Sequence, residues 1–287
     1  MKAVQALAQA IDRCDGALVA VTGAGLSTAS GIGDYRDREG NYKRPPPVTI
    51  SAFTASHAAR QRYWARSLYG WPAFAAARPN AAHAAVARLE HAGMLAHTIT
   101  QNVDGLHQAA GTRALTELHG NLRWVHCMEC AATVEREVFQ SELRGRNEQL
   151  LGLRATPAPD GDADLQDAQL DAVQVPDCAV CGGLLKPAVV FFGDTVPAPV
   201  VSAAYEQVDA ARGLLVLGSS VMIHSSFRFC RRAKERGIPI YAVNLGRTRA
   251  DEWLSMKLEA PCEEVLPGLC DVLGLPSGGN FVGVADL

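Results

Sequence analysis

Two pairs of cysteines share one spacing and give the strongest chemical signal in the chain. They are Cys127-Met-Glu-Cys130 and Cys178-Ala-Val-Cys181. A two-residue gap lets a tight turn direct both sulfurs at one point, and four thiolates form a closed tetrahedral zinc site. A thioredoxin-like redox pair and four unrelated thiols are the alternatives. We predict that the four cysteines bind a structural Zn²⁺ ion, which leaves no open coordination position for catalysis.

A glycine-rich turn directly follows the apolar run ALVAVT. It reads GAGLSTASGIGDYR, from Gly23 to Arg36. Such a turn presents backbone N–H groups to a phosphate, and Gly23 and Gly25 would let the backbone approach a pyrophosphate closely. A connection that binds nothing is the alternative. Thr28 stands where the third glycine of the dehydrogenase fingerprint would be, which argues against hydride transfer.

Polar residues follow two further predicted strands. They are the segment TQNVDGLH at 100–107 and the segment ELHG at 117–120. The carboxyl ends of parallel strands are where ligands sit in an open α/β sheet. His119 is a candidate general base because the reference pKa of imidazole is near 6.5. Taken singly, such residues are more often caps or turn residues, as Asp104 could be, and we expect His107 to be structural.

Short apolar runs alternate with helical patterns along the chain. This alternation predicts an α/β fold with a parallel sheet covered by helices on both faces. The predicted strands cover residues 17–21, 97–100, 114–118, 188–192, 214–217 and 239–243. The predicted helices lie near residues 80–92, 198–211 and 225–236, and one more near 262–273 closes the sheet.

Two segments interrupt this alternation and predict a smaller second domain. Residues 37–78 open with a proline-rich turn and continue as an aromatic-rich helical module. Residues 121–186 form a zinc-binding module with the two cysteine pairs, and its stretch 157–171 is rich in Asp, Pro and Gly. That composition cannot support a core, so we predict an exposed, mobile insert there. The predicted large domain comprises residues 1–36, 79–120 and 187–287.

The composition excludes several classes of protein. Of the 287 residues, 48% are hydrophobic and 20% charged, which excludes disorder over the whole length. No uncharged apolar run approaches the roughly 18 residues of a membrane span. The net charge of −3 argues against a dedicated nucleic-acid binder. The N-terminus has the pattern of an amphipathic helix, not of a signal peptide, so we expect a reducing compartment in which the cysteines are not disulfide-bonded.

In their order and spacing, these segments resemble the sirtuin family. The likeness rests on GAGLSTASGIGDYR, TQNVDGLH, ELHG, the two Cys-x-x-Cys pairs, KPAVVFFGD, GSS and VNLG, and it covers about residues 10–270. The combination is highly specific, although its parts are not. The segments RQRYWARSLYGWP, QVPDCAVCGGLLKPAVVFFGDTV and APDGDADL resemble the class II branch, typified by the fourth, mitochondrial human sirtuin.

The resemblance implies a fold and an activity. The fold is a Rossmann-like large domain with a smaller domain made of a helical module and a zinc module. The activity is NAD⁺-dependent deacylation of protein lysines, in which the acyl-lysine amide oxygen attacks the nicotinamide ribose and nicotinamide leaves. His119 then accepts a proton from the ribose hydroxyls, and O-acyl-ADP-ribose is formed. NAD⁺ is therefore consumed, and acylated-lysine proteins or peptides are the expected partners, with no membrane and no nucleic acid.

The resemblance also assigns residues to three parts of an NAD⁺ site. The phosphate cradle and the nicotinamide half would involve Gly23, Ala24, Gly25, Ser27, Asp34, Tyr35, Arg36, Gln101, Asn102, Val103 and Asp104. The adenosine half would be flanked by Gly218, Ser219, Ser220, Asn244, Leu245, Gly246 and Cys262. Asn102 and Asp104 would join His119 in catalysis, and Cys127, Cys130, Cys178 and Cys181 map onto the zinc ligands.

Two further groups would contact the acylated peptide. Val190, Phe191, Phe192 and Gly193 match the segment that takes up the peptide as an added strand. Tyr63 and Arg66 share a face of a predicted helix, so a phenol and a guanidinium could bind one carboxylate. A similar Tyr-x-x-Arg in class III sirtuins recognises acidic acyl groups, and a core tyrosine with a solvated arginine is the alternative. We predict a preference for acidic or long acyl groups over acetyl.

One position departs from the family pattern. The family has proline where this chain has Gly33, in the loop that folds over NAD⁺. Proline restricts the unfolded loop by about 0.4–1 kcal/mol and glycine does not. We predict a more mobile loop and weaker NAD⁺ binding.

Two other functions stay open on the sequence. Protein mono-ADP-ribosyl transfer would use the same NAD⁺ site and pass ADP-ribose to a protein side chain. A nucleic-acid-binding or scaffold protein built on the zinc module would leave His119 and residues 101–104 unexplained. We expect a bacterial cytoplasmic location, or the mitochondrial matrix for a processed eukaryotic form.

Overall fold

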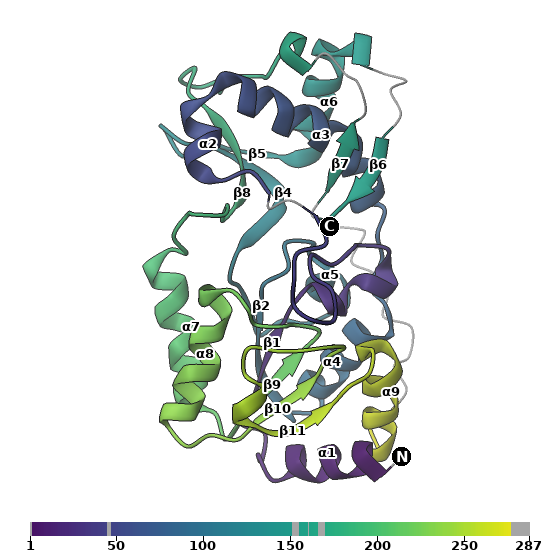
Figure 1. The fold of residues 1–287 in the computed structure, drawn as a ribbon. Helices are drawn as coiled ribbons and strands as arrows, with labels where there is room; N and C mark the ends of the chain where they lie inside the picture. The colour runs from purple at the N-terminus through teal and green to yellow at the C-terminus, as the bar shows by residue number, and fades with distance from the viewer. Residues whose placement is uncertain (1, 45–46, 151–154, 160, 166–169, 277–287) are drawn as a thin grey trace.

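The computed structural model has a large lobe built on one sheet and a small lobe beside it (Figure 1). It describes residues 2–44, 47–150, 155–159, 161–165 and 170–276. Among these residues, no helix combines the length and the apolar character that crossing a bilayer requires.

The large lobe contains a six-stranded parallel sheet in the order β11-β10-β9-β1-β2-β3. From β1 the chain adds β2 and β3 on one side, and later β9, β10 and β11 on the other. The direction of winding therefore switches between β1 and β9, where α/β sheets bind ligands outside the carboxyl ends of their strands. The strands are β1 (Leu18–Thr22), β2 (Leu95–Thr100), β3 (Leu115–Glu117), β9 (Gly213–Leu217), β10 (Ile240–Val243) and β11 (Leu254–Leu258).

Helices cover both faces of this sheet. Every position of β1, β9 and β10 is buried, as expected for strands covered twice. On one face α1, α4 and α9 pack against Leu18 and Leu215, and on the other α7 and α8 pack against Val19 and Val216. These helices are α1 (Lys2–Asp12), α4 (Ala81–His91), α7 (Ala198–Ala210), α8 (His224–Glu235) and α9 (Cys262–Val272).

The small lobe combines helices with two short antiparallel sheets (Figure 1). β4 pairs with β5 and β8, and β6 pairs with β7. Phe53, Trp64, Phe139 and Phe191 lie in its core. Its elements are α2 (Ile50–Ala55), α3 (His57–Ala75), β4 (Gly120–Cys127), β5 (Thr133–Glu135), α6 (Arg136–Arg146), η3 (Glu148–Leu150), β6 (Ala155–Ala158), β7 (Asp162–Leu165), η4 (Leu170–Ala172) and β8 (Leu185–Val189). Short helices elsewhere are η1 (Ala24–Leu26), η2 (Thr28–Ser30), α5 (Leu106–Ala109) and η5 (Asp251–Trp253).

The predicted α/β fold with a parallel sheet is confirmed, but one predicted strand is wrong. Residues 188–192 do not form a strand of the parallel sheet, because β8 ends at Val189 and pairs with β4 in the small lobe. An apolar run indicates burial but not which sheet buries it. The sequence analysis also missed β4, in which buried, half-buried and exposed positions are mixed, and the edge strand β11, in which most positions are half-buried. The predicted domain boundaries after residues 120 and 186 fall within β4 and β8, and they stay a prediction.

The prediction of an exposed, mobile insert at residues 157–171 is wrong for the part of it that the structure describes. β6 and β7 form a hairpin that lies on α3, and Ala163 is only 1% exposed. A Cβ on Gly70 of α3 would lie 2.3 Å from the Gly161 carbonyl oxygen, so glycine at this position permits the contact. Residues 160 and 166–169 of the predicted insert lie outside the described residues.

Candidate active site

Four loops meet beyond the carboxyl ends of four adjacent strands. They follow β1, β2, β9 and β10 and contain residues 23–27, 101–104, 218–220 and 244–246. Because β10, β9, β1 and β2 are consecutive in the sheet, the loops form one rim across the switch point between β1 and β9. We call these four segments the strand-end rim.

Hydrogen bonds join the segments of the strand-end rim to one another. The side-chain amide of Gln101 donates to Ser219 Oγ at 2.7 Å and to the Thr22 carbonyl at 3.0 Å. Asn102 Nδ2 donates to the Gly23 carbonyl at 3.1 Å. Hydroxyl and amide groups of this kind suit ribose hydroxyls and a carboxamide, so the residues present fit a dinucleotide.

The glycines of the rim are needed for loop packing. A Cβ on Gly25 would lie 2.9 Å from the Gly218 carbonyl oxygen, and a Cβ on Gly23 would lie 2.7 Å from that of Ser219. Gly218 itself has a φ of +56°, which favours glycine. The glycine-rich turn therefore lets two loops touch, a role that the sequence analysis did not give it.

A partly buried polar network links the first loop to the second. The Ser27 hydroxyl donates to Asp104 Oδ2 at 2.7 Å and accepts from Asn102 Nδ2 at 3.0 Å. His83 Nε2 lies 3.4 Å from the same hydroxyl, while its Nδ1 accepts from the Asn80 N–H at the start of α4. Burial lowers the pKa of His83 to about 4, so the ring is neutral at neutral pH. The network holds Asp104 in one position.

His119 follows β3 and is anchored through both ring nitrogens. Its Nδ1 lies 3.0 Å from the Gln101 carbonyl oxygen, and its Nε2 lies 2.9 Å from Ser225 Oγ. A carbonyl only accepts, so the proton of the neutral ring is on Nδ1 and the lone pair is on Nε2. Burial lowers the pKa of His119 to about 4, although the Gln101 carbonyl raises it and Arg228 lowers it further. At neutral pH, Nε2 is therefore ready to accept a proton.

Asp34 and Tyr35, two of the predicted NAD⁺ contacts, each have a side-chain partner. Asp34 forms an ion pair with Lys43. The Tyr35 ring meets the Phe192 ring edge-on at a centroid distance of 6.5 Å. Their predicted roles toward NAD⁺ stay predictions.

Arg36 is held within its own loop. Its guanidinium lies 3.8 Å from the centroid of the Tyr42 ring and donates to the Gly40 carbonyl at 2.6 Å. The loop reaches the strand-end rim through Arg38, whose carbonyl accepts from the Arg247 N–H at 2.7 Å. The predicted contact of Arg36 with a ribose would need these side-chain contacts to change.

Three other predicted residues lie in apolar or exposed surroundings. Val103 is 6% exposed in a small apolar cluster with Trp71. Cys262 is 1% exposed, and burial raises the pKa of its thiol to about 12. Leu245 is 42% exposed beside the Asn244 amide, which donates to its carbonyl at 2.9 Å.

The predicted peptide-binding segment begins next to His119. The Val190 N–H donates to the His119 carbonyl at 2.9 Å, and the Phe192 carbonyl accepts from the Ile50 N–H at 2.9 Å. Phe191 points into the core of the small lobe and is 8% exposed. The segment therefore connects the two lobes at the position of His119.

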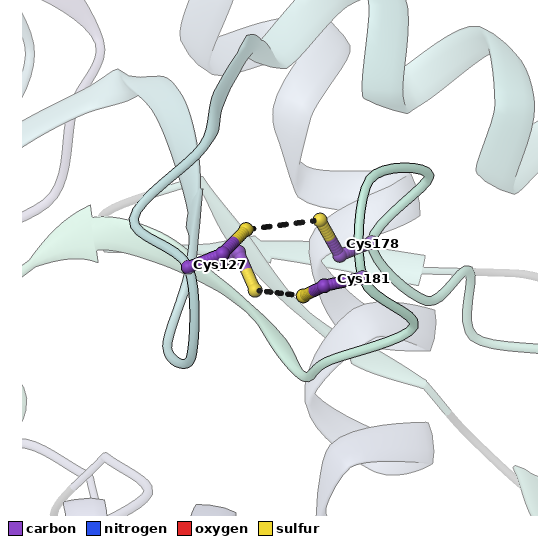
Figure 2. A group of neighbouring side chains, drawn as sticks. Cys127, Cys178 and Cys181 are labelled. Atoms are coloured by element: carbon purple, nitrogen blue, oxygen red, sulfur yellow. Dashed lines mark hydrogen bonds between the residues drawn. The ribbon is translucent and has the colours of Figure 1, made fainter.

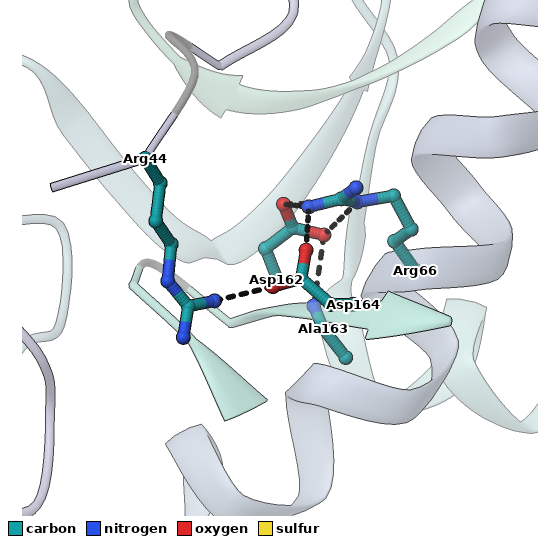
Figure 3. Close-up of polar contacts among 5 residues, drawn as sticks. All are labelled: Arg44, Arg66, Asp162, Ala163 and Asp164. Atoms are coloured by element: carbon teal, nitrogen blue, oxygen red, sulfur yellow. Dashed lines mark hydrogen bonds and ion pairs between the residues drawn. The ribbon is translucent and has the colours of Figure 1, made fainter. Parts of the chain in front are cut away.

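Tyr63 and Arg66 do not form the free carboxylate-binding pair that the sequence predicts. Arg66 donates from Nε and Nη2 to Asp162, at 2.8 Å for the shortest contact, and from Nη2 to Asp164 at 2.9 Å. Figure 3 shows both carboxylates directed at Arg66, with Arg44 on Asp164 from the other side. Tyr63 packs among aromatic rings of the small-lobe core, and burial raises its pKa. The two aspartates lie in the hairpin that the sequence analysis took for an unstructured insert.

The four predicted zinc ligands meet in the small lobe (Figure 2). Their sulfurs all lie within 4.8 Å of one another. The Sγ distance is 3.5 Å from Cys127 to Cys181 and 3.7 Å from Cys130 to Cys178. A tetrahedral zinc–thiolate site has sulfurs about 3.8 Å apart, because each lies about 2.3 Å from the metal. The cluster therefore fits a structural Zn²⁺ ion.

The sequence analysis missed two side chains that contact predicted site residues. They are His83, which reaches Ser27, and Ser225, which reaches His119. Asn80 three residues before His83 is a helix-start pattern that could have drawn attention to it. For Ser225 there was no such signal. His107 is structural as expected, since it is 1% exposed and its Nε2 lies 2.9 Å from the Thr22 hydroxyl.

Comparison with known proteins gives one consistent result. A model of the Sir2 family matches residues 23–225. NAD-dependent protein deacetylase 2 of Bradyrhizobium diazoefficiens is 53% identical over 249 residues, which cover 87% of this chain and 91% of that protein. The NAD-dependent protein deacetylase of Xanthomonas axonopodis pv. citri is also 53% identical over 249 residues, covering 87% of this chain and 85% of that protein.

Solved structures agree with these relatives. A structure from work on the mechanism and regulation of Sir2 enzymes superimposes with a TM-score of 0.74 at 27% identity, over 95% of this chain and 98% of that chain. A Sir2 variant with a deacetylated p53 peptide and 3′-O-acetyl ADP-ribose gives 0.73 at 27%, over 92% and 98%. A complex of a Sir2 homologue with NAD gives 0.69 at 31%, over 90% and 89%.

Proposed function

The chain belongs to the Sir2 family of NAD-dependent protein deacetylases, and we propose that His119 is the base with which it removes acyl groups from protein lysines. The observation that carries this assignment is the state of the His119 ring. Nδ1 donates to the backbone carbonyl of Gln101 in the strand-end rim, the pKa of the ring is about 4, and Nε2 carries the lone pair. A proton acceptor that is neutral and fixed in orientation suits general-base catalysis.

We further propose how the rim residues take part. Gln101, Asn102 and Asp104 bind the nicotinamide ribose and carboxamide, because their loop follows β2, the neighbour of β1, and contacts the loop that contains Gly23 and Ser27. NAD⁺, when bound, supplies the ribose–nicotinamide bond that is broken and the ADP-ribose that accepts the acyl group. His119 takes up the ribose proton.

The acyl group is the finer part of the proposal. The preference for acidic acyl groups that the sequence predicts would need the Arg66 guanidinium to bind the acyl carboxylate. In the described contacts, Asp162 and Asp164 already neutralise Arg66. An acidic acyl group would have to displace both carboxylates, so we propose that acetyl and other neutral acyl groups are the better substrates.

The partners and the subclass are proposed on separate grounds. A solved Sir2 complex contains a p53 peptide, which supports an acylated peptide as the partner at residues 190–193 of this chain. Membership of class II is proposed from the segments RQRYWARSLYGWP and APDGDADL. A cytoplasmic location is proposed because the relatives described above are bacterial proteins.

The test is an NAD⁺-dependent nicotinamide-release assay on a panel of acyl-lysine peptides, with His119→Ala as the control. Release that continues over many turnovers, requires acetyl-lysine peptide and is lost in the variant supports the proposal. Release without any acyl peptide, together with labelling of protein by ADP-ribose, would favour ADP-ribosyl transfer. A tenfold higher kcat/KM for succinyl or glutaryl peptide than for acetyl peptide would restore the acidic preference.

A further inference from the structure

Ser225 is the side chain that contacts the basic nitrogen of His119. It is the second residue of α8, and its Oγ lies 2.9 Å from Nε2. Within the described part of the chain, the hydroxyl has no other hydrogen-bond partner. The next residue, Ser226, is different, because its hydroxyl donates back to the Ile223 carbonyl at 3.2 Å. Two adjacent serines thus have separate roles, and only one of them faces the predicted base.

The ring of His119 has little freedom to present Nε2 elsewhere. Nδ1 is bound to the Gln101 carbonyl, and the backbone carbonyl of His119 accepts from the Val190 N–H. The single lone pair of the neutral ring is on Nε2, and the Ser225 O–H donates to it. In this arrangement the Ser225 hydroxyl occupies the hydrogen-bond position of Nε2.

We propose that Ser225 relays the proton from the substrate hydroxyl to His119, an inference that rests on the proposed function. As the ribose hydroxyl loses its proton to Ser225 Oγ, Ser225 passes its own proton to Nε2. The O–H bond of the ribose hydroxyl breaks, and its oxygen keeps the electron pair. At Ser225 one O–H bond forms and one breaks, and at His119 an N–H bond forms. Reversal of the relay returns the proton when the product oxygen is protonated.

The charges around the ring explain why a relay helps. Burial lowers the pKa of His119, and so does the positive charge of Arg228, which lies on α8 with Ser225. The Gln101 carbonyl favours the protonated ring. After the transfer, Ser225 Oγ can accept from the new Nε2–H, and a hydrogen bond to a charged donor is stronger than one between neutral groups. The hydroxyl therefore stabilises the imidazolium in a site that otherwise disfavours it.

The experiment compares three variants of the full chain on an acetyl-lysine peptide. We expect Ser225→Ala to lower kcat about 100-fold, the low end of what general acid–base catalysis contributes. The KM for NAD⁺ should stay within about twofold of the parent value, because Ser225 is not needed for binding in this scheme. Ser225→Thr keeps the hydroxyl and should restore most of the rate. Ser226→Ala is the matched control and should behave as the parent does.

A second readout separates the relay from earlier steps. Exchange of labelled nicotinamide into NAD⁺ should persist in Ser225→Ala, since nicotinamide leaves before the proton moves. A kcat for Ser225→Ala equal to or above that of the parent would overturn the proposal, because the hydroxyl would then only compete with the substrate for Nε2. Loss of exchange together with turnover would also overturn it, by placing Ser225 in binding.

A third readout does not depend on activity. In the ligand-free protein, the ¹⁵N resonance of His119 Nε2 should be that of a hydrogen-bonded lone pair and should move toward the free value in Ser225→Ala. An unchanged resonance would refute the contact on which the relay depends. If the resonance moves in Ser225→Ala as expected but the parent shows no NAD⁺ turnover, the proposed function fails while the contact stands.

Discussion

The cysteine cluster and the strand-end rim are both sites built from separated segments, but they are assembled in different ways. Each cysteine pair is local in sequence, and antiparallel pairing of β4 with β8 brings the two pairs together, with Cys127 opposite Leu185. The strand-end rim takes one loop from each of four parallel strands, whose order is set by the whole large lobe. The cluster therefore supports the local fold, whereas the rim depends on a fold that other residues stabilise. Substitutions in the two regions should fail in different ways.

The largest effect is expected from removing a ligand of the cluster. Cys178→Ala should abolish zinc binding and unfold the small lobe, because structural zinc in small modules contributes about 10–16 kcal/mol. Zinc content by elemental analysis and the thermal unfolding midpoint measure this. Cys14→Ala is a matched control, since Cys14 lies outside the cluster, in the core of the large lobe. Its buried thiol donates a hydrogen bond to the Ala10 carbonyl. A Cys178→Ala protein that retains one zinc per chain would refute the assignment.

A substitution in the active site should leave the fold intact. His119→Ala is expected to lower kcat/KM for deacetylation by about 10²- to 10⁴-fold, the usual contribution of a general base. Zinc content and the unfolding midpoint should stay close to those of the parent, in contrast to Cys178→Ala. A variant that loses activity only because it unfolds would remove the distinction between the two regions.

The cysteine cluster is assembled from local pairs and the strand-end rim from distant loops, and this difference decides how well the sequence predicts each of them. The cysteine cluster was predictable because ligand spacing is a local property. The rim segments were predictable as strand ends, but their contacts, such as Gln101 with Ser219, depend on the strand order β9-β1-β2, which periodicity does not give.

The errors have a physical cause as well. Arg66 and its two aspartates come from segments about 100 residues apart, and no local pattern links them. Ser225 was not selected because a serine near a helix start is ordinarily a cap. It contacts His119, which follows β3, although α8 itself packs on β9 and β10 on the other side of β1.

Acid should weaken the large lobe through three buried histidines. Burial lowers the pKa to about 4 for His83 and His119 and to about 3 for His107, below the ordinary value near 6.5. Below about pH 6.5 the unfolded chain binds up to three more protons than the folded one. The free energy of unfolding should therefore fall as the pH is lowered toward 4, by at most about 4 kcal/mol per pH unit.

Urea unfolding followed between about pH 7.5 and pH 5 measures this slope. His107→Gln should reduce the slope by about one proton, since burial lowers the pKa of His107 the furthest of the three, to about 3. Equal free energies of unfolding at the two ends of that range would show that these rings titrate normally in the folded protein. Deacetylation itself should persist down to about pH 5, because the pKa of His119 is near 4.

The smallest effect concerns the loop after η2. Gly33 has a φ outside the left-handed region, and a Cβ there would have its nearest contact at 3.8 Å, to Pro159. Its N–H has no backbone partner among the described residues. Neither a left-handed φ nor a backbone hydrogen bond thus excludes proline, and Gly33→Pro should lower the KM for NAD⁺ about two- to fivefold, equivalent to about 0.4–1 kcal/mol of loop entropy.

Gly31 provides the control for this prediction. It lies in the same loop with a φ of +85°, which proline cannot adopt. Gly31→Pro should therefore raise the KM for NAD⁺, while Gly33→Pro lowers it. Because the two variants add the same ring to the same loop, opposite shifts separate preorganisation from a general effect of proline. An unchanged or raised KM in Gly33→Pro would mean that loop entropy does not limit binding, and that the strand-end rim alone sets the affinity for NAD⁺.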